Sequence, residues 1–278
     1  MRNASTKIVL LAALLGAAAV FSIGFILFDA LVIEPNWMTV RTVRVRSPSL
    51  ARVLQDRRLV QVSDLHLQDR LGFREKSLIE RINRLRPDLV LFTGDYVESP
   101  RAAPLVANLL SRLKPKLWCY GVLGNADRAY LKGNDFVTAW KRAGLSLIGE
   151  RNLKIQLGPG EGFFWLAGVD YGGEGAIPAA LDGVPPEEPL IVLAANPDLA
   201  PALAERGADL VLSGDTHGGQ VTLPGWDRLL ADYGRSPFLR GLFRLDGGYL
   251  YVNRGIASKP YPVRFLCPPE ITLFNFTE

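Results

Sequence analysis

Histidine and cysteine are scarce in this chain of 278 residues, with two of each. Cys119 falls in an apolar run and Cys267 lies far from it in sequence, so we expect no disulfide between them. The net charge is only +4 and the basic residues are spread along the chain, which argues against nucleic-acid binding. With 48% apolar residues, the chain has enough material for a packed core and little reason to be disordered.

One long stretch without charge lies near the N-terminus. Ile8–Phe28 follows Arg2 and Lys7 and is long enough to cross a bilayer as a helix. A cleaved signal peptide is the alternative, but the small residues Ala17–Ala19 are followed by more apolar residues, so cleavage there would leave a hydrophobic end. We therefore predict an uncleaved membrane anchor over residues 1–28.

Residues 29–58 are predicted to form a tether that leads into an edge strand. Val40, Val43 and Val45 alternate with arginines, which is typical of an edge strand protected by charge. A basic collar that contacts anionic lipid is the alternative. Because basic residues flank the apolar run on both sides, the charge bias only slightly favours placing the domain on the exported side.

From residue 59 onward, short apolar segments alternate with segments of helical spacing, and strands then follow in series. Strands are predicted at residues 59–64, 88–92, 117–123, 145–148, 153–157, 163–169, 190–194, 210–213, 220–223, 250–253 and 271–276. Helices are predicted at residues 77–85, 102–113, 136–143 and 199–206. This order predicts an α/β domain over residues 59–278 in which two sheets pack together with helices outside.

Polar residues follow several of these strands. They are Asp64, His66, Asp95, Asn125, Asn196, Asp215 and His217. Each short motif alone is ordinary, because Gly-Asp and Gly-Asn occur in many turns. As an ordered set they are much more specific, since strand ends converge on one rim of a sheet. Carboxylate, imidazole and amide groups together suit Zn, Fe or Mn, and a pair of such ions about 3.5–4 Å apart can clamp a phosphate.

The set of motifs resembles the calcineurin-like metallophosphoesterases over about residues 59–278. The resemblance is strongest to the membrane-anchored or exported bacterial branch, which is related to the UDP-2,3-diacylglucosamine pyrophosphatases. The motifs that carry it are Ser63-Asp64-Leu65-His66-Leu67, Gly218-Gly219-Gln220-Val221, Tyr251-Val252-Asn253-Arg254-Gly255, Arg264-Phe265 and Cys267-Pro268-Pro269-Glu270-Ile271. It implies a four-layer α/β/β/α sandwich with two metal ions at one end.

The resemblance also implies metal ligands. Asp64, His66, Asp95 and His217 match the first site, with Asp95 bridging to the second and Asn125 holding the second ion. The chain departs from the family pattern at Ala126, Asn196 and Asp215, where the family has histidine.

The departures fall on the second site and leave it with oxygen donors from Asn196 and Asp215. Oxygen ligands favour hard cations, so we expect Mn, Zn or Fe in site one and Mn, Mg or Ca in site two. The alternative is decay of the second site, which would leave one metal ion or none.

The predicted function is therefore that of a metal-dependent phosphoesterase. By resemblance, a metal-bound hydroxide would attack a phosphodiester or phosphoanhydride, with a lipid or cell-envelope phosphate as one candidate substrate. Arg128 and Arg254 are candidate phosphate contacts. The resemblance further implies a monomeric single-pass protein of the bacterial inner membrane. The alternative is a catalytically weak relative that binds phosphate ligands or partners.

One segment of mixed aromatic, aliphatic and basic residues follows the last motif. It extends from Trp226 to Phe243. We expect it to pack on its own domain, and the alternative is a cap suited to a lipid phosphate.

Overall fold

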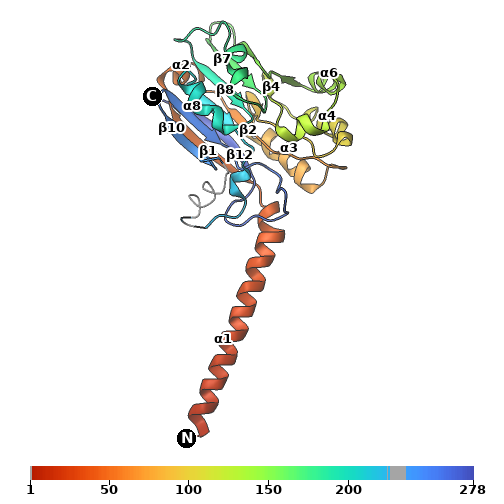
Figure 1. The fold of residues 1–278 in the computed structure, drawn as a ribbon, viewed down its shortest axis with the longest axis vertical. Coiled ribbons are helices and arrows are strands. Elements are labelled where there is room, and N and C mark those ends of the chain that lie inside the picture. Colours follow the sequence, from red (N-terminus) through yellow and green to blue (C-terminus); the bar gives the residue numbers. More distant parts are fainter. Residues whose placement is uncertain (1, 224, 226–235) are drawn as a thin grey trace.

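The computed structural model describes residues 2–223, 225 and 236–278 (Figure 1). Helix α1 (Arg2–Phe28) projects from the rest of the protein as a separate rod. Within the span Thr6–Asn36, the most apolar stretch of 18 residues has a mean hydropathy of 2.5 and contains no buried residue. The predicted apolar helix is therefore present and is long enough to cross a membrane.

Helical structure continues beyond α1. A π-helical turn, η1 (Asp29–Ile33), and a 3₁₀ turn, η2 (Glu34–Asn36), lead directly to the first strand. Most of the segment assigned as a tether is thus regular structure that ends against the domain.

Two six-stranded sheets form the centre of the described part of the chain. The first has the order β1 (Thr39–Arg46), β12 (Glu270–Thr277), β2 (Leu59–Val62), β3 (Leu89–Phe92), β4 (Trp118–Gly121) and β5 (Leu145–Leu147). The second has the order β10 (Gly241–Leu245), β11 (Gly248–Val252), β9 (Leu210–Ser213), β8 (Leu190–Ala194), β7 (Phe163–Val169) and β6 (Arg151–Gln156). Strands β2 to β5 run parallel, as do β7, β8, β9 and β11. Their carboxyl ends therefore form a common rim in each sheet.

Helices cover the outer face of each sheet. The first sheet is covered by α3 (Phe73–Leu85), α4 (Ala103–Leu110) and α6 (Asp135–Arg142), and the second by α7 (Ile177–Ala180) and α8 (Ala200–Ala204). The shorter elements are α2 (Pro48–Leu54), η3 (Pro100–Ala102), α5 (Asn125–Tyr130), η4 (Glu174–Ala176), η5 (Pro197–Leu199) and η6 (His217–Gly219).

The alternation of side chains along the strands produces the layers. In β3, Leu89 and Leu91 pack between the two sheets, whereas Val90 and Phe92 pack against the helices. A third apolar layer separates the second sheet from α7 and α8. Both faces of each sheet are thus covered, as expected for mostly parallel strands, and the predicted four-layer α/β/β/α sandwich is confirmed.

The secondary structure differs from the prediction at a few places. The predicted strand at 220–223 is reduced to a single bridge between Val221 and Phe265, because Gln220 has a left-handed backbone with φ 57°. Helices α2, α5 and α7 and strand β10 were not predicted. The sequence did hold a signal for β10, because Asp246-Gly247 is the two-residue turn that joins it to β11.

Candidate metal centre

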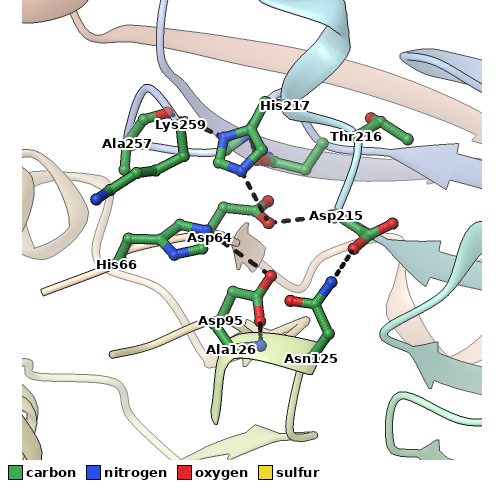
Figure 2. Close-up of polar contacts among 12 residues, drawn as sticks. Asp64, His66, Asp95, Asn125, Ala126, Asp215, Thr216, His217, Ala257 and Lys259 are labelled. Atoms are coloured by element: carbon green, nitrogen blue, oxygen red, sulfur yellow. Dashed lines mark hydrogen bonds and ion pairs between the residues drawn. The ribbon is translucent and has the colours of Figure 1, made fainter. Parts of the chain in front are cut away.

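The ends of three strands bring part of the predicted ligand set together. Asp64 follows β2, Asp95 follows β3, and His217 lies just after β9 in η6 (Figure 2). One donor atom from each of Asp64, His66 and His217 lies within 4.8 Å of the others, and all three residues are buried. The rims of the two sheets are joined here, because the Asp215 N–H donates to Asp64 Oδ1 at 3.0 Å.

Both imidazoles are oriented by an acceptor on the outer side of the ring. Nδ1 of His66 lies 2.7 Å from a Glu98 carboxylate oxygen, and Nδ1 of His217 lies 3.1 Å from the Ala257 carbonyl oxygen. Because carboxylate and carbonyl oxygens accept, each Nδ1 carries the proton and each Nε2 keeps its lone pair. Figure 2 shows the two rings beside Asp64, and their centroids are 5.1 Å apart. This arrangement is typical of metal-binding histidines.

Glu98 is a supporting residue that the sequence analysis missed. We expect Glu98→Ala to weaken Mn²⁺ binding about 10- to 100-fold, because the His66 ring loses the group that fixes its orientation. Calorimetric titration of the full-length protein measures this loss. Glu98→Gln keeps an acceptor and should lose less Mn²⁺ affinity. Glu80 is an exposed carboxylate on α3, so Glu80→Ala should lose no affinity. Equal affinities for Glu98→Ala and Glu80→Ala would contradict the assignment.

The cluster is chemically suited to a divalent cation. Asp64 Oδ2 and His66 Nε2 are buried and have no hydrogen-bond partner. Burial raises the pKa of Asp64 and lowers the pKa of His66. Burial and the neighbouring carboxylates of Asp64 and Asp127 raise the pKa of Asp95 to about 9. A cation among these groups would compensate their lost hydration and favour the metal-binding protonation states.

The predicted second-site residues meet only in part. Asp95, Asn125 and Asp215 line one pocket of about 520 Å³ together with His66 and His217. Asn125 Nδ2 donates to Asp215 Oδ1 at 3.3 Å, so these two side chains bond each other (Figure 2).

Asn196 is not among the residues that line this pocket. Its side-chain oxygen accepts the Asp198 N–H at 3.0 Å and caps η5. Of the four oxygen donors predicted for site two, three therefore share the pocket.

The backbone is unusual where the ligands lie. Asp64, His66, Asp95, Asp215 and His217 all have positive φ, between 42° and 70°. Non-glycine residues rarely adopt this conformation, and such residues cluster at functional sites.

Gly124 shows how tightly the loops are packed. A β-carbon at this position would lie 2.0 Å from Asp95 Oδ1, so the backbone needs glycine to approach that carboxylate.

Two further residues near the centre were not predicted. Asp127 is buried and accepts the N–H groups of Tyr96 and Gly124 at 2.8 and 2.9 Å, so it ties two ligand loops together. Burial raises its pKa to about 7. Lys259 lines the site pocket and lies 3.6 Å from Glu98, and no motif in the sequence marks it.

The two candidate phosphate contacts lie elsewhere. Arg128 donates to the Tyr171 carbonyl, and Arg254 pairs with Glu270 at 3.3 Å. Neither residue is among those that line the pocket. Of the segment from Trp226 to Phe243, residues 226–235 lie outside the described residues, and Leu239 in the remainder is buried.

Comparison with known proteins identifies the family. The family pattern described as calcineurin-like phosphoesterase matches residues 57–219. The chain is 27% identical to the uncharacterized metallophosphoesterase YkuE of Bacillus subtilis, covering 87% of each chain. It is 28% identical to the UDP-2,3-diacylglucosamine pyrophosphatase LpxG of Chlamydia trachomatis, covering 87% of this chain and 90% of the relative. It is also 28% identical to the phosphodiesterase YaeI of Escherichia coli, covering 87% of this chain and 89% of the relative. This chain therefore belongs to the calcineurin-like phosphoesterase family.

Proposed function

We propose that the protein is a metal-dependent phosphoesterase that hydrolyses phosphodiester or phosphoanhydride bonds. The observation that carries this proposal is the buried cluster of Asp64, His66 and His217, in which both imidazoles direct Nε2 inward. A divalent cation held by these three residues would supply a Lewis acid for a phosphoryl oxygen and would lower the pKa of water.

The surrounding residues favour good leaving groups. Ala126 stands where the family has a histidine that assists the leaving group, so its side chain offers no proton. Its backbone N–H donates to Asp95 Oδ1 at 2.9 Å. A general acid typically contributes 10²–10⁴-fold, so its absence costs least when the leaving group is itself acidic, such as a phosphate. Lys259 lines the pocket and offers a cation for substrate phosphate in place of Arg128 and Arg254.

The names of relatives support the choice of substrates. One is called a phosphodiesterase and another acts on UDP-2,3-diacylglucosamine, which carries lipid chains. We propose a phosphate-bearing substrate of lipid or cell-envelope origin. We also propose that the protein is a monomer held in the bacterial inner membrane by α1, with residues 59–278 on the exported side.

For the second site we propose a hard cation, Mn, Mg or Ca, held by oxygens of Asp95, Asn125 and Asp215, with Asn196 brought in by a shift of η5. The alternative is a weak or inactive relative that binds phosphate ligands or partners. The contact between Asn125 and Asp215 favours that alternative, because each side chain satisfies the other without an ion.

A metal count combined with one histidine replacement separates these proposals. We expect the full-length protein to hold two Mn²⁺ ions and to hydrolyse bis(p-nitrophenyl) phosphate. Asp215→His should then lower the rate about 10-fold or more, equivalent to about 1.4 kcal/mol of transition-state stabilisation, because it removes a hard oxygen ligand. Elemental analysis and steady-state rates provide the two measurements.

The other outcomes show whether the second metal site, the phosphoesterase activity or both are absent. One bound ion with hydrolysis intact would refute the second site alone. One bound ion without hydrolysis, restored by histidine at positions 126, 196 and 215, would support decay of the second site.

A further inference from the structure

The segment that leaves the membrane helix is bound to the loop that supports the metal centre. The Ala30 carbonyl accepts the Arg264 N–H at 2.9 Å, and the Glu34 carboxylate accepts the N–H groups of Leu266, at 2.8 Å, and of Cys267. Glu34 is only 7% exposed. The end of the anchor is therefore fixed to the domain by several bonds rather than joined to it by a flexible linker.

The same loop reaches the ligands. The Ala257 N–H donates to the Asp64 carbonyl at 2.9 Å, and the Ala257 carbonyl accepts from His217. In Figure 1 the loops of the C-terminal part, drawn in blue, surround the end of α1 where it meets the domain. The candidate metal centre thus lies at the end of the domain from which the anchor leaves.

A second pocket connects the candidate metal centre with the end of the anchor. It has a volume of about 870 Å³, and its lining extends from His66 to Asn36, the last residue of η2. It shares His66, Lys259 and Pro260 with the pocket of the metal centre. Two arginines, Arg70 and Arg74, and two carboxylates, Asp69 and Glu75, also line it, and Arg74 Nε donates to Glu75 at 3.0 Å.

The most exposed large apolar side chains outside the anchor helix lie around this pocket. Phe73 is 82% exposed, Tyr261 71%, Trp37 64% and Leu266 54%. Apart from Leu31 and Val32 in η1, at 52% and 47%, the other large apolar residues exposed in the described chain beyond α1 reach only 37–40%. Phe73 itself lines the pocket, Trp37 follows Asn36, and Tyr261 lies between two prolines that line it. Leu266 lies nearby because its N–H donates to Glu34, two residues before Asn36. We name Trp37, Phe73, Tyr261 and Leu266 the apolar rim.

We propose that the apolar rim rests in the headgroup layer of the bilayer that α1 crosses, so that the second pocket opens onto lipid headgroups. Aromatic residues concentrate at membrane interfaces, and clusters of exposed apolar side chains mark interaction surfaces. Arg70 adds attraction for anionic lipid at the same surface, whereas Arg74 and Lys259 are paired with Glu75 and Glu98. The docking surface itself does not depend on catalysis; only its use for collecting a lipid phosphate rests on the proposed function.

Depth-dependent quenching in lipid nanodiscs tests this surface with the full-length protein. Phe73→Cys and Tyr261→Cys, each labelled with an environment-sensitive dye, should lose emission when lipids carry a nitroxide near the headgroup. Native Cys119 and Cys267 are buried and should stay unlabelled. Trp118→Cys is the matched control, because Trp118 is the first residue of β4, whereas the metal centre lies at the carboxyl ends of the strands.

Each outcome bears on the proposal. Lipid-dependent quenching at 73 and 261, with none at 118, supports it. Quenching of all three dyes by aqueous iodide alone overturns it. Because neither readout involves hydrolysis, a failure of the phosphoesterase assay leaves this result unaffected. Because Phe73 lines the pocket, the depth of the dye at position 73 in the bilayer also shows where the pocket opens.

Discussion

Replacing His217 by alanine is expected to lower phosphodiester hydrolysis at least about 100-fold, because losing a metal ligand should cost more than the 10- to 100-fold typical of an outer partner. The variant should also lose one metal ion per chain. The rate on bis(p-nitrophenyl) phosphate and the metal content after dialysis are the measurements. Both effects follow from the position of His217 in the buried cluster with Asp64 and His66.

The other histidine provides an internal check. His66→Ala should lose as much activity as His217→Ala. The double variant should lose no more than either one, because both remove the same ion and residues that act as a unit are not additive. Losses that multiply, or a variant that keeps its activity, would show that the two imidazoles do not share a metal. Thermal unfolding in the presence of a chelator shows whether the variants keep the fold.

Arg264→Ala is expected to reduce the free energy of unfolding by at least about 3 kcal/mol, because hydrogen bonds to charged groups contribute about 1.5–3 kcal/mol each and buried acceptors would be left unpaired. Arg264 is fully buried and donates to the backbone carbonyls of Arg254, Gly255, Ala257 and Cys267. Urea unfolding of the detergent-solubilised protein, followed by tryptophan fluorescence, measures the change.

Two other variants separate this role from a general effect of removing charge. Arg264→Lys keeps the charge but offers a single donor group, so it should be intermediate. Arg244→Ala removes an exposed arginine on β10 and should change stability by less than about 0.5 kcal/mol. If Arg264→Ala were no less stable than Arg244→Ala, the carbonyl contacts would contribute nothing.

The local sequence pattern was enough to predict much of the fold. The β3 segment is apolar at every position because helices cover one face and a second sheet covers the other, so Leu89 to Phe92 could be recognised without knowing its neighbours. The same logic placed Asp64 and Asp95 directly after strands. Their left-handed backbone could not be predicted, since it depends on loops that pack around them, such as the one at Gly124.

Residues that act through tertiary contacts could not be predicted from the local sequence pattern. Glu98 and Lys259 are distant in sequence and meet only because two loops converge beside His66. Asn196 shows the converse, because it follows a strand as a ligand would, yet its oxygen caps the turn that Pro197 begins. Arg264 lies in a motif that indicates the family branch, but nothing local reveals that it binds four carbonyls.

The position of β12 has a consequence for how the protein is made. It lies between β1 and β2, and the contact of Thr39 with Pro269 joins residues 230 positions apart. During synthesis, α1 leaves the ribosome long before β12 exists. Until then β1 and β2 present unpaired edges, which are prone to wrong pairing. The last strand of the sheet therefore closes the domain after α1 has already left the ribosome.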